Sequence, residues 1–396
     1  MSHSFRTALV AALMVFECAA LNFIPSRDVP PAVFGLKIER SGPRHLNALR
    51  RRDSVTVGLD NQVSVTSVRR LKEVLTTTSL QINSYSANLS LGTQELRVRI
   101  DTGSSDLWVN TKSSRVCSLG SDPCSESGTY NANSSSSYKF LSDDFNVTYA
   151  DGSAALGDYA TDTLSIGDKN LDEFQFGIGY QSSTTSGILG LGYTANEAQV
   201  NRNNKKPYPN LPQALVDAKL INSNAYSLWL DDLQSSTGSI LFGGVDTDKY
   251  TGSLQTLPIQ KVQGEFAELL LSISGLSISQ SGNNQSTTSD LPTAAILDSG
   301  STMTYLPDDL TSEIYNALNV QFSQRQGSGF CSCDLANENI TVGFTFTSPT
   351  ISVPISELVI NPNEDISQDR LELEKRQGLS NQDSLCIFGI APTGGI

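Results

Sequence analysis

The chain has 396 residues, of which 38% are hydrophobic and 17% charged, and its formal net charge is −14. This length allows two or three domains of about 150 residues each, and the hydrophobic content excludes a wholly disordered chain. The acidic balance argues against a nucleic-acid binder, because such proteins carry a basic face. The only two histidines, His3 and His45, are close to the N-terminus. If that end is removed, Ser-His-Asp catalysis, Cys-His catalysis and histidine-ligated zinc are all excluded.

The first twenty residues are typical of a secretory signal peptide. Arg6 supplies a positive start, Ala8 to Phe16 form an apolar stretch, and Cys18-Ala-Ala20 is a small-residue cleavage site. The apolar stretch is shorter than the ~20 residues that a membrane span needs. A cleaved signal over residues 1–20 is therefore favoured over a membrane anchor or a buried helix.

A basic segment follows the signal. Residues 21–52 contain seven Lys or Arg against two acidic residues, whereas the chain from residue 53 onward contains 19 basic and 38 acidic residues. This contrast predicts a propeptide that is held by charge and released when acid neutralises the carboxylates. A basic linker is the alternative. A processing protease is expected to cut after Arg52 or after Arg70, so the propeptide ends at one of these residues.

Five Asn-X-Ser/Thr sequences occur in the chain. Each is weak by itself, but together with a signal peptide they indicate a secreted glycoprotein. The candidate glycosylation sites are Asn88, Asn133, Asn146, Asn284 and Asn339.

Short alternations of apolar and polar residues, separated by Gly, Ser, Asn and Asp, dominate the body and predict an all-β fold. The strands are expected at Leu96–Ile100, Phe145–Tyr149, Asp162–Ile166, Leu269–Ile273 and Ile340–Phe346. Helices are predicted only over Leu211–Ala218 and Pro307–Leu318. Residues 196–210 and 281–293 have the polar composition of surface loops.

One internal repeat carries the functional signal. The segment Leu96–Ser105 and the segment Thr293–Thr302 each run from a predicted strand into Asp-Thr/Ser-Gly-Ser. The two aspartates, Asp101 and Asp298, are separated by the length of a domain. The repeat therefore predicts two related lobes, each of which supplies one aspartate at the end of a strand.

Two carboxyl groups that meet between such lobes have a defined chemistry. At a separation of about 3 Å they cannot both ionise, so they share one proton. The ionised member takes a proton from a water molecule, and the protonated member donates to the carbonyl oxygen of the bond that is cut. This is acid–base hydrolysis without a metal, a cofactor or a covalent intermediate.

The residues that follow each aspartate suit this role. We expect the two glycines to let backbone amides approach the carboxylates, and the Thr/Ser pair to exchange hydrogen bonds between the loops. We expect the two serines to donate to the outer carboxylate oxygens. The three pairs are Gly103 with Gly300, Thr102 with Ser299, and Ser104 with Ser301.

These motifs resemble the pepsin-type aspartic endopeptidases, and the likeness extends from about Tyr85 to the end of the chain. The stretches Tyr208–Asp217, Ile221–Leu230 and Gly238–Asp246 are similar to the fungal yapsin and candidapepsin-like branch. The resemblance implies a bilobal all-β fold with a cleft that binds an extended peptide. It places an N-terminal lobe over residues 71–265 and a C-terminal lobe over residues 266–396.

The resemblance also implies a β-hairpin flap over the cleft. Tyr149-Ala-Asp-Gly-Ser153 matches the flap motif, with Trp108 placed to meet the tyrosine hydroxyl. Asp151, next to Gly152 at the tip, is a candidate acceptor for the substrate backbone or for a basic side chain. Ile188-Leu-Gly190 matches the apolar segment that packs beside the first aspartate loop.

Two disulfides are implied by the same resemblance. Cys117 and Cys124 would close a small loop after the first motif. Cys386 would pair with Cys333 or Cys331, and the sequence around Cys333 fits the family position better, which leaves one cysteine over. The oxidising compartment favours disulfides over metal ligation.

The chain departs from the family at its end. Relatives continue beyond the counterpart of Ala391–Ile396 into a second apolar segment and further strands. We therefore expect the last strands of the C-terminal lobe to be missing from this sequence. A C-terminal membrane or cell-wall anchor, present in some yapsins, would also lie beyond it.

The sequence thus predicts a monomeric, secreted aspartic endopeptidase that hydrolyses proteins at acidic pH. The main alternative is an inactive pepsin-like protein that acts only in binding, and a carbohydrate-binding cell-wall protein is a third. The presence of both aspartates, both glycines and the flap tyrosine favours the protease.

Overall fold

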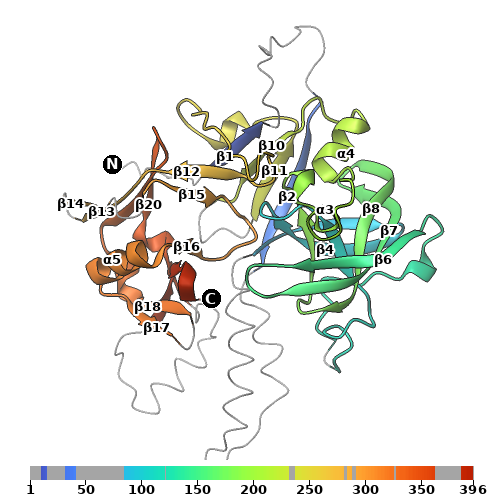
Figure 1. Ribbon diagram of the computed structural model, residues 1–396, viewed down its shortest axis with the longest axis horizontal. Coiled ribbons are helices and arrows are strands. Elements are labelled where there is room, and N and C mark those ends of the chain that lie inside the picture. The colour runs from blue at the N-terminus through green and yellow to red at the C-terminus, as the bar shows by residue number, and fades with distance from the viewer. Residues whose placement is uncertain are drawn as a thin grey trace, which may run out of the picture. The chain divides into compact units, whose positions relative to one another are not determined.

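Figure 1 shows the computed structural model of the chain, which consists mostly of strands. It describes residues 10–15, 32–41, 84–120, 122–231, 237–280, 283–287, 291–324, 327–361 and 385–395. The predicted processing sites, Arg52 and Arg70, lie outside the described residues. So does the predicted signal peptide apart from β1, and its cleavage stays a prediction.

The elements carry the labels of Figure 1. The helices are α3 (Ala198–Asn203), α4 (Leu211–Asp217) and α5 (Asp308–Leu318). The strands up to residue 242 are β1 (Val10–Val15), β2 (Phe34–Ser41), β3 (Ser84–Leu91), β4 (Gln94–Asp101), β5 (Leu107–Asn110), β6 (Lys139–Thr148), β7 (Ala154–Ile166), β8 (Lys169–Ser182), β9 (Gly187–Gly190), β10 (Ala225–Trp229) and β11 (Thr237–Phe242). The later strands are β12 (Leu270–Ile273), β13 (Gly275–Gln280), β14 (Asn283–Thr287), β15 (Thr293–Ile296), β16 (Thr304–Leu306), β17 (Gln321–Ser323), β18 (Ser328–Ser332), β19 (Ile340–Thr345), β20 (Thr350–Pro354), β21 (Val359–Ile360), β22 (Leu385–Phe388) and β23 (Ile390–Pro392).

The described residues divide into two compact units. The first holds the described parts of Met1–Arg40 and Tyr85–Leu271, together with the short segment Ile296–Gly300. The second holds those of Ser41–Ser84, Ser272–Ala295 and Ser301–Ile396. The segment that contains Asp298 therefore clusters with the first unit.

The first unit is built on one large sheet with the strand order β1-β10-β11-β2-β3-β4-β9-β5-β8-β7-β6. Tight turns at Gly92 (φ 59°) and Gly167 (φ 57°) close the β3–β4 and β7–β8 hairpins, as expected where glycine supplies a positive φ. β9 is parallel to β4 and antiparallel to β5. Because β9 pairs with both β4 and β5, it fixes the position of the β4–β5 loop, which begins at Asp101.

β2 lies in the predicted propeptide but is an inner strand of this sheet. It pairs with β11 and neighbours β3. Phe34, Leu36 and Ile38 are buried, while Gly35 and Lys37, which alternate with them, are exposed. The alternation matches the period of two in a strand with one face on the core.

Both predicted helices are confirmed, as α4 and α5. The side chain of Asn210 caps the start of α4 by accepting from the Gln213 amide. Asp308 and Asp309 lie in the first turn of α5, and Asn319 ends it in the left-handed conformation. Carboxylates in a first turn are favoured by the helix dipole.

The two segments predicted as surface loops contain regular structure, although residues 201–207 are exposed as predicted. Residues 196–210 contain α3, and Glu197, Ala198 and Tyr208 are buried there. Polar composition misled the prediction for the buried part, where Glu197 Oε2 accepts from the Tyr208 amide and the Tyr208 hydroxyl donates to Asp106. Residues 281–293 contain β14, which pairs with β13.

The second unit contains α5 and several small sheets. β14, β13, β19 and β20 form one sheet, and β17, β18, β22 and β21 form another. β16 is parallel to β23, as β5 is parallel to β8 in the first unit. Among the described strands of the second unit, none pairs with β16 in the way that β9 pairs with β5.

Candidate active site

The first half of the site is the loop between β4 and β5. Asp101 ends β4 and is buried. Its Oδ1 accepts from the Gly103 amide at 2.9 Å, and its Oδ2 accepts from the Ser104 hydroxyl at 2.5 Å. Both predicted contacts of this aspartate are therefore present, and they fix its carboxylate in one orientation.

The second half is the segment that follows β15. The Gly300 amide donates to Asp298 Oδ1 at 2.8 Å, which repeats the contact of Gly103 with Asp101. Asp298 is partly buried. Ser301 belongs to the second unit, and its predicted contact with the carboxylate stays a prediction.

Four hydrogen bonds join the two loops. The Thr102 amide donates to Ser299 Oγ at 3.2 Å, and the Ser299 amide donates to Thr102 Oγ1 at 2.9 Å. Each hydroxyl then donates onward to a backbone carbonyl of the opposite segment, Thr102 to Leu297 at 2.8 Å and Ser299 to Ile100 at 3.1 Å. The exchange expected between Thr102 and Ser299 is thus present in both directions.

The two glycines allow the carboxylates to come together. A Cβ atom on Gly103 would lie 2.7 Å from the Asp298 carboxyl carbon, and one on Gly300 would lie 2.5 Å from Asp101 Oδ1. Each carboxylate therefore packs directly on the backbone of the opposite loop. No residue larger than glycine fits at either position without displacing a carboxylate.

This environment changes the acidity of Asp101. Burial raises its pKa, and the neighbouring charge of Asp298 raises it further, against the lowering by the Ser104 and Gly103 hydrogen bonds. A carboxyl group next to another carboxylate in a buried site retains its proton to higher pH.

The flap residues lie on the β6–β7 hairpin. Tyr149 follows β6, and its amide donates to the Ser153 carbonyl across the turn. Trp108 Nε1 donates to the Tyr149 hydroxyl at 2.7 Å, which is the contact predicted from the sequence. At the tip, Gly152 has φ 78°, and Asp151 accepts from the Ser153 amide at 2.8 Å.

Two buried carboxyl groups near the site were missed by the sequence analysis. Asp106 lies in the β4–β5 loop, and its Oδ1 accepts from the hydroxyls of Tyr159 and Tyr208, at 3.2 and 2.8 Å. Glu197 is fully buried, and its Oε2 accepts from the Tyr208 amide at 2.9 Å. Burial raises the pKa of Glu197 to about 9. The aromatic Tyr208 between two prolines was the one sequence signal that residues 196–210 are not a solvated loop.

The cysteines pair as the resemblance implied. The disulfides Cys117–Cys124 and Cys333–Cys386 are both present, and Cys331 is a buried free thiol. Cys331 stands opposite Cys386 in the β18–β22 pairing, but Cys386 forms its disulfide with Cys333.

Two further observations concern the described part of the chain as a whole. No group of three or more His, Cys, Asp or Glu side chains there has the arrangement to hold a metal ion. Within the same residues, no helix has the length and apolar character required to cross a membrane.

A family model described as eukaryotic aspartyl protease matches residues 84–389, a range that includes both aspartate loops and the flap. The chain belongs to this family. Its enzyme class is therefore aspartic-type endopeptidase, a class of hydrolases.

Fungal proteases are among the relatives of this aspartyl protease. It is 46% identical to a probable aspartic-type endopeptidase, opsB, of Aspergillus fumigatus, over all of this chain and 76% of that protein. It is 37% identical to secreted aspartic protease 8 of Candida albicans, over 70% of this chain and 65% of that protein.

Solved structures identify the fold. An aspartic proteinase from Irpex lacteus superposes with a TM-score of 0.60 at 21% identity, over 78% of this chain and 84% of that one. The predicted fold class, the all-β bilobal pepsin-like fold, is confirmed.

Proposed function

We propose that this protease is a secreted endopeptidase that cuts proteins at acidic pH with Asp101 and Asp298 as a shared-proton pair. The observation that carries the proposal is the reciprocal bonding of Thr102 and Ser299, which locks the two aspartate loops together. Gly103 also packs on the carboxylate of Asp298. Together, these contacts support a pair of carboxyl groups that are too close for both to ionise.

The chemistry follows from one shared proton. The ionised carboxylate removes a proton from a water molecule placed between the two groups, and that water attacks the peptide carbonyl. The protonated carboxyl donates to the carbonyl oxygen as negative charge develops there. The Ser104 hydroxyl and the Gly103 and Gly300 amides hold the carboxylates in place throughout.

The flap is assigned to substrate binding. Tyr149, fixed by Trp108, would cover an extended peptide and exclude water from the bond that is cut. Exposed Asp151 at the tip keeps its second carboxylate oxygen for a basic substrate side chain, because only Oδ1 is used by the Ser153 amide. Equal cleavage after Lys and Leu, unchanged in Asp151→Ser, would remove that role.

Secretion is supported by the oxidised cysteine pairs and by the surface position of the sequons. Asn88, Asn133 and Asn339 are exposed, and Asn146 is partly exposed. The side chain of Asn284, in β14, lies outside the described residues. We infer an extracellular monomer whose substrates are proteins, made as a precursor and processed at Arg52 or Arg70.

The test compares the expressed chain with Asp298→Asn on a library of peptides at about pH 4. We expect cleavage at defined bonds by the first and a loss of at least ~10³-fold by the second, because the pair cannot share a proton with an amide. An inactive binding protein would give no cleavage by either chain. Equal cleavage by both would exclude the pair as the catalytic centre.

A further inference from the structure

The segment that follows β9 is bonded to the aspartate loop along its whole length. Backbone amides of residues 190–192 donate to carbonyls of the β4–β5 loop at 2.8 to 3.0 Å. Ser105 Oγ donates to the Tyr193 carbonyl at 2.7 Å, and Asn196 Nδ2 donates to the Gly103 carbonyl at 3.3 Å. The segment thus enters α3 in a position set by the aspartate loop.

The start of α3 is anchored in the core beneath the site. The Ala198 amide donates to Asp106 Oδ2 at 2.8 Å. Ala198 and Tyr208 belong to the same apolar cluster as Trp108, against which Tyr149 packs. Because Asp106 belongs to the aspartate loop, this buried contact ties the helix to the catalytic side of the unit.

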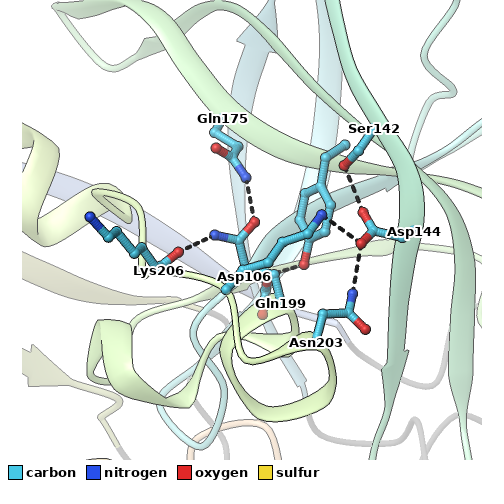
Figure 2. Close-up of polar contacts among 9 residues, drawn as sticks. Asp106, Ser142, Asp144, Gln175, Gln199, Asn203 and Lys206 are labelled. Carbon is cyan, nitrogen blue, oxygen red and sulfur yellow. Dashed lines mark hydrogen bonds and ion pairs between the residues drawn. The ribbon is translucent and has the colours of Figure 1, made fainter.

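The other end of α3 contacts the flap hairpin. Arg202 Nη2 donates to Thr148 Oγ1 at 2.7 Å, one residue before the flap tyrosine. Asn203 Nδ2 and Lys205 Nζ both contact Asp144 Oδ2, at 2.8 and 2.5 Å. Figure 2 shows Asn203 and Ser142 pointing to the carboxylate of Asp144 in β6, where Ser142 bonds the other oxygen.

We propose that residues 197–205, which we call the brace, couple the aspartate loop to the flap, and that Arg202 and Lys205 are positioning residues for Tyr149. The proposal rests on the proposed function of the flap. Nothing in the brace touches the reacting atoms; it acts by restricting the hairpin that carries Tyr149.

The expected effect is on substrate binding more than on the chemical step. A flap held near its closed position loses little conformational freedom when the peptide binds, whereas a released flap must be ordered at that moment. Contacts between exposed side chains are individually weak. Removing Arg202 should therefore raise KM by about three- to tenfold and change kcat by less than about twofold.

The kinetic experiment uses Arg202→Ala, Lys205→Ala and Lys206→Ala. Lys206 is the matched control, because it carries the same charge in the same loop while contributing only its carbonyl, which accepts from Gln199. We expect the first two variants to raise KM and the control to match the unaltered chain. Arg202→Lys keeps a positively charged donor group, so its KM should lie between those of Arg202→Ala and the unaltered chain.

A second readout does not depend on activity. In the Asp298→Asn background, which prevents self-digestion, hydrogen exchange is followed for the amides of residues 147–154 and of the β3–β4 hairpin. Arg202→Ala should increase exchange in the flap alone. Equal exchange in Arg202→Ala and Lys206→Ala, or an equal increase in both hairpins, would overturn the positioning role. If the unaltered chain cuts no peptide, the proposed function fails while the exchange data still decide the coupling.

Discussion

At the scale of single residues, the buried carboxyl of Glu197 makes a prediction about pH. Its Oε2 accepts from the Tyr208 amide, but its Oε1 has no hydrogen-bond partner among the described residues, so burial of the charged form is only partly compensated. The pKa rises from 4.5 to about 9 on folding. The folded chain therefore binds more protons than the unfolded chain between these values. Stability is fully present below about pH 4.5 and falls with increasing pH by up to about 1.4 kcal/mol per unit.

Glu197→Gln tests this prediction. The amide oxygen retains the contact with the Tyr208 amide but never ionises. We expect the difference between the melting temperatures at pH 5 and pH 8 to shrink in the variant, with little change at pH 5. An unchanged difference would show that Glu197 does not set the neutral-pH stability.

At the scale of elements, the sequence predicted the strands and helices whose burial alternates regularly. The prediction failed for the buried part of residues 196–210, where polar groups are buried because they hydrogen-bond to other polar groups. No local pattern reports that Asp106, on a distant loop, accepts from Tyr208 and the Ala198 amide. The motif containing Asp101 is one continuous segment that the sequence shows directly, whereas the contacts of the brace join segments far apart in the chain.

The strand β2 gives a prediction at the same scale. Ile38 is fully buried between β11 and β3, although its segment was predicted to be a propeptide. Ile38→Ala should lower the unfolding free energy of the unprocessed chain by about 2–4 kcal/mol, because it removes buried methyl groups and leaves a cavity. Lys37→Ala, on the exposed face of the strand, should change it by less than about 0.5 kcal/mol. Denaturant titration of both variants measures the difference.

At the scale of the whole molecule, the acidic composition and the raised pKa of Asp101 both favour activity at acidic pH in the proposed mechanism. In the proposed mechanism, activity requires one proton on the pair, and burial together with the charge of Asp298 raises the pKa of Asp101. The rate should therefore fall as pH rises through this pKa, and fall again in strong acid when both carboxyls are protonated. A rate that increases steadily from about pH 4 to pH 8 would contradict the shared-proton mechanism.

Two processes reduce activity near neutral pH, and the chain allows them to be separated. Loss of the catalytic proton is reversible, so activity should return when the pH is lowered. Ionisation of Glu197 instead lowers the stability of the first unit, and chains that unfold and aggregate do not recover. We expect Glu197→Gln to keep the same pH–rate profile in initial rates while recovering more activity after an hour at pH 8. If the variant shifted the profile itself, the buried glutamate would be coupled to the catalytic pair and not to stability alone.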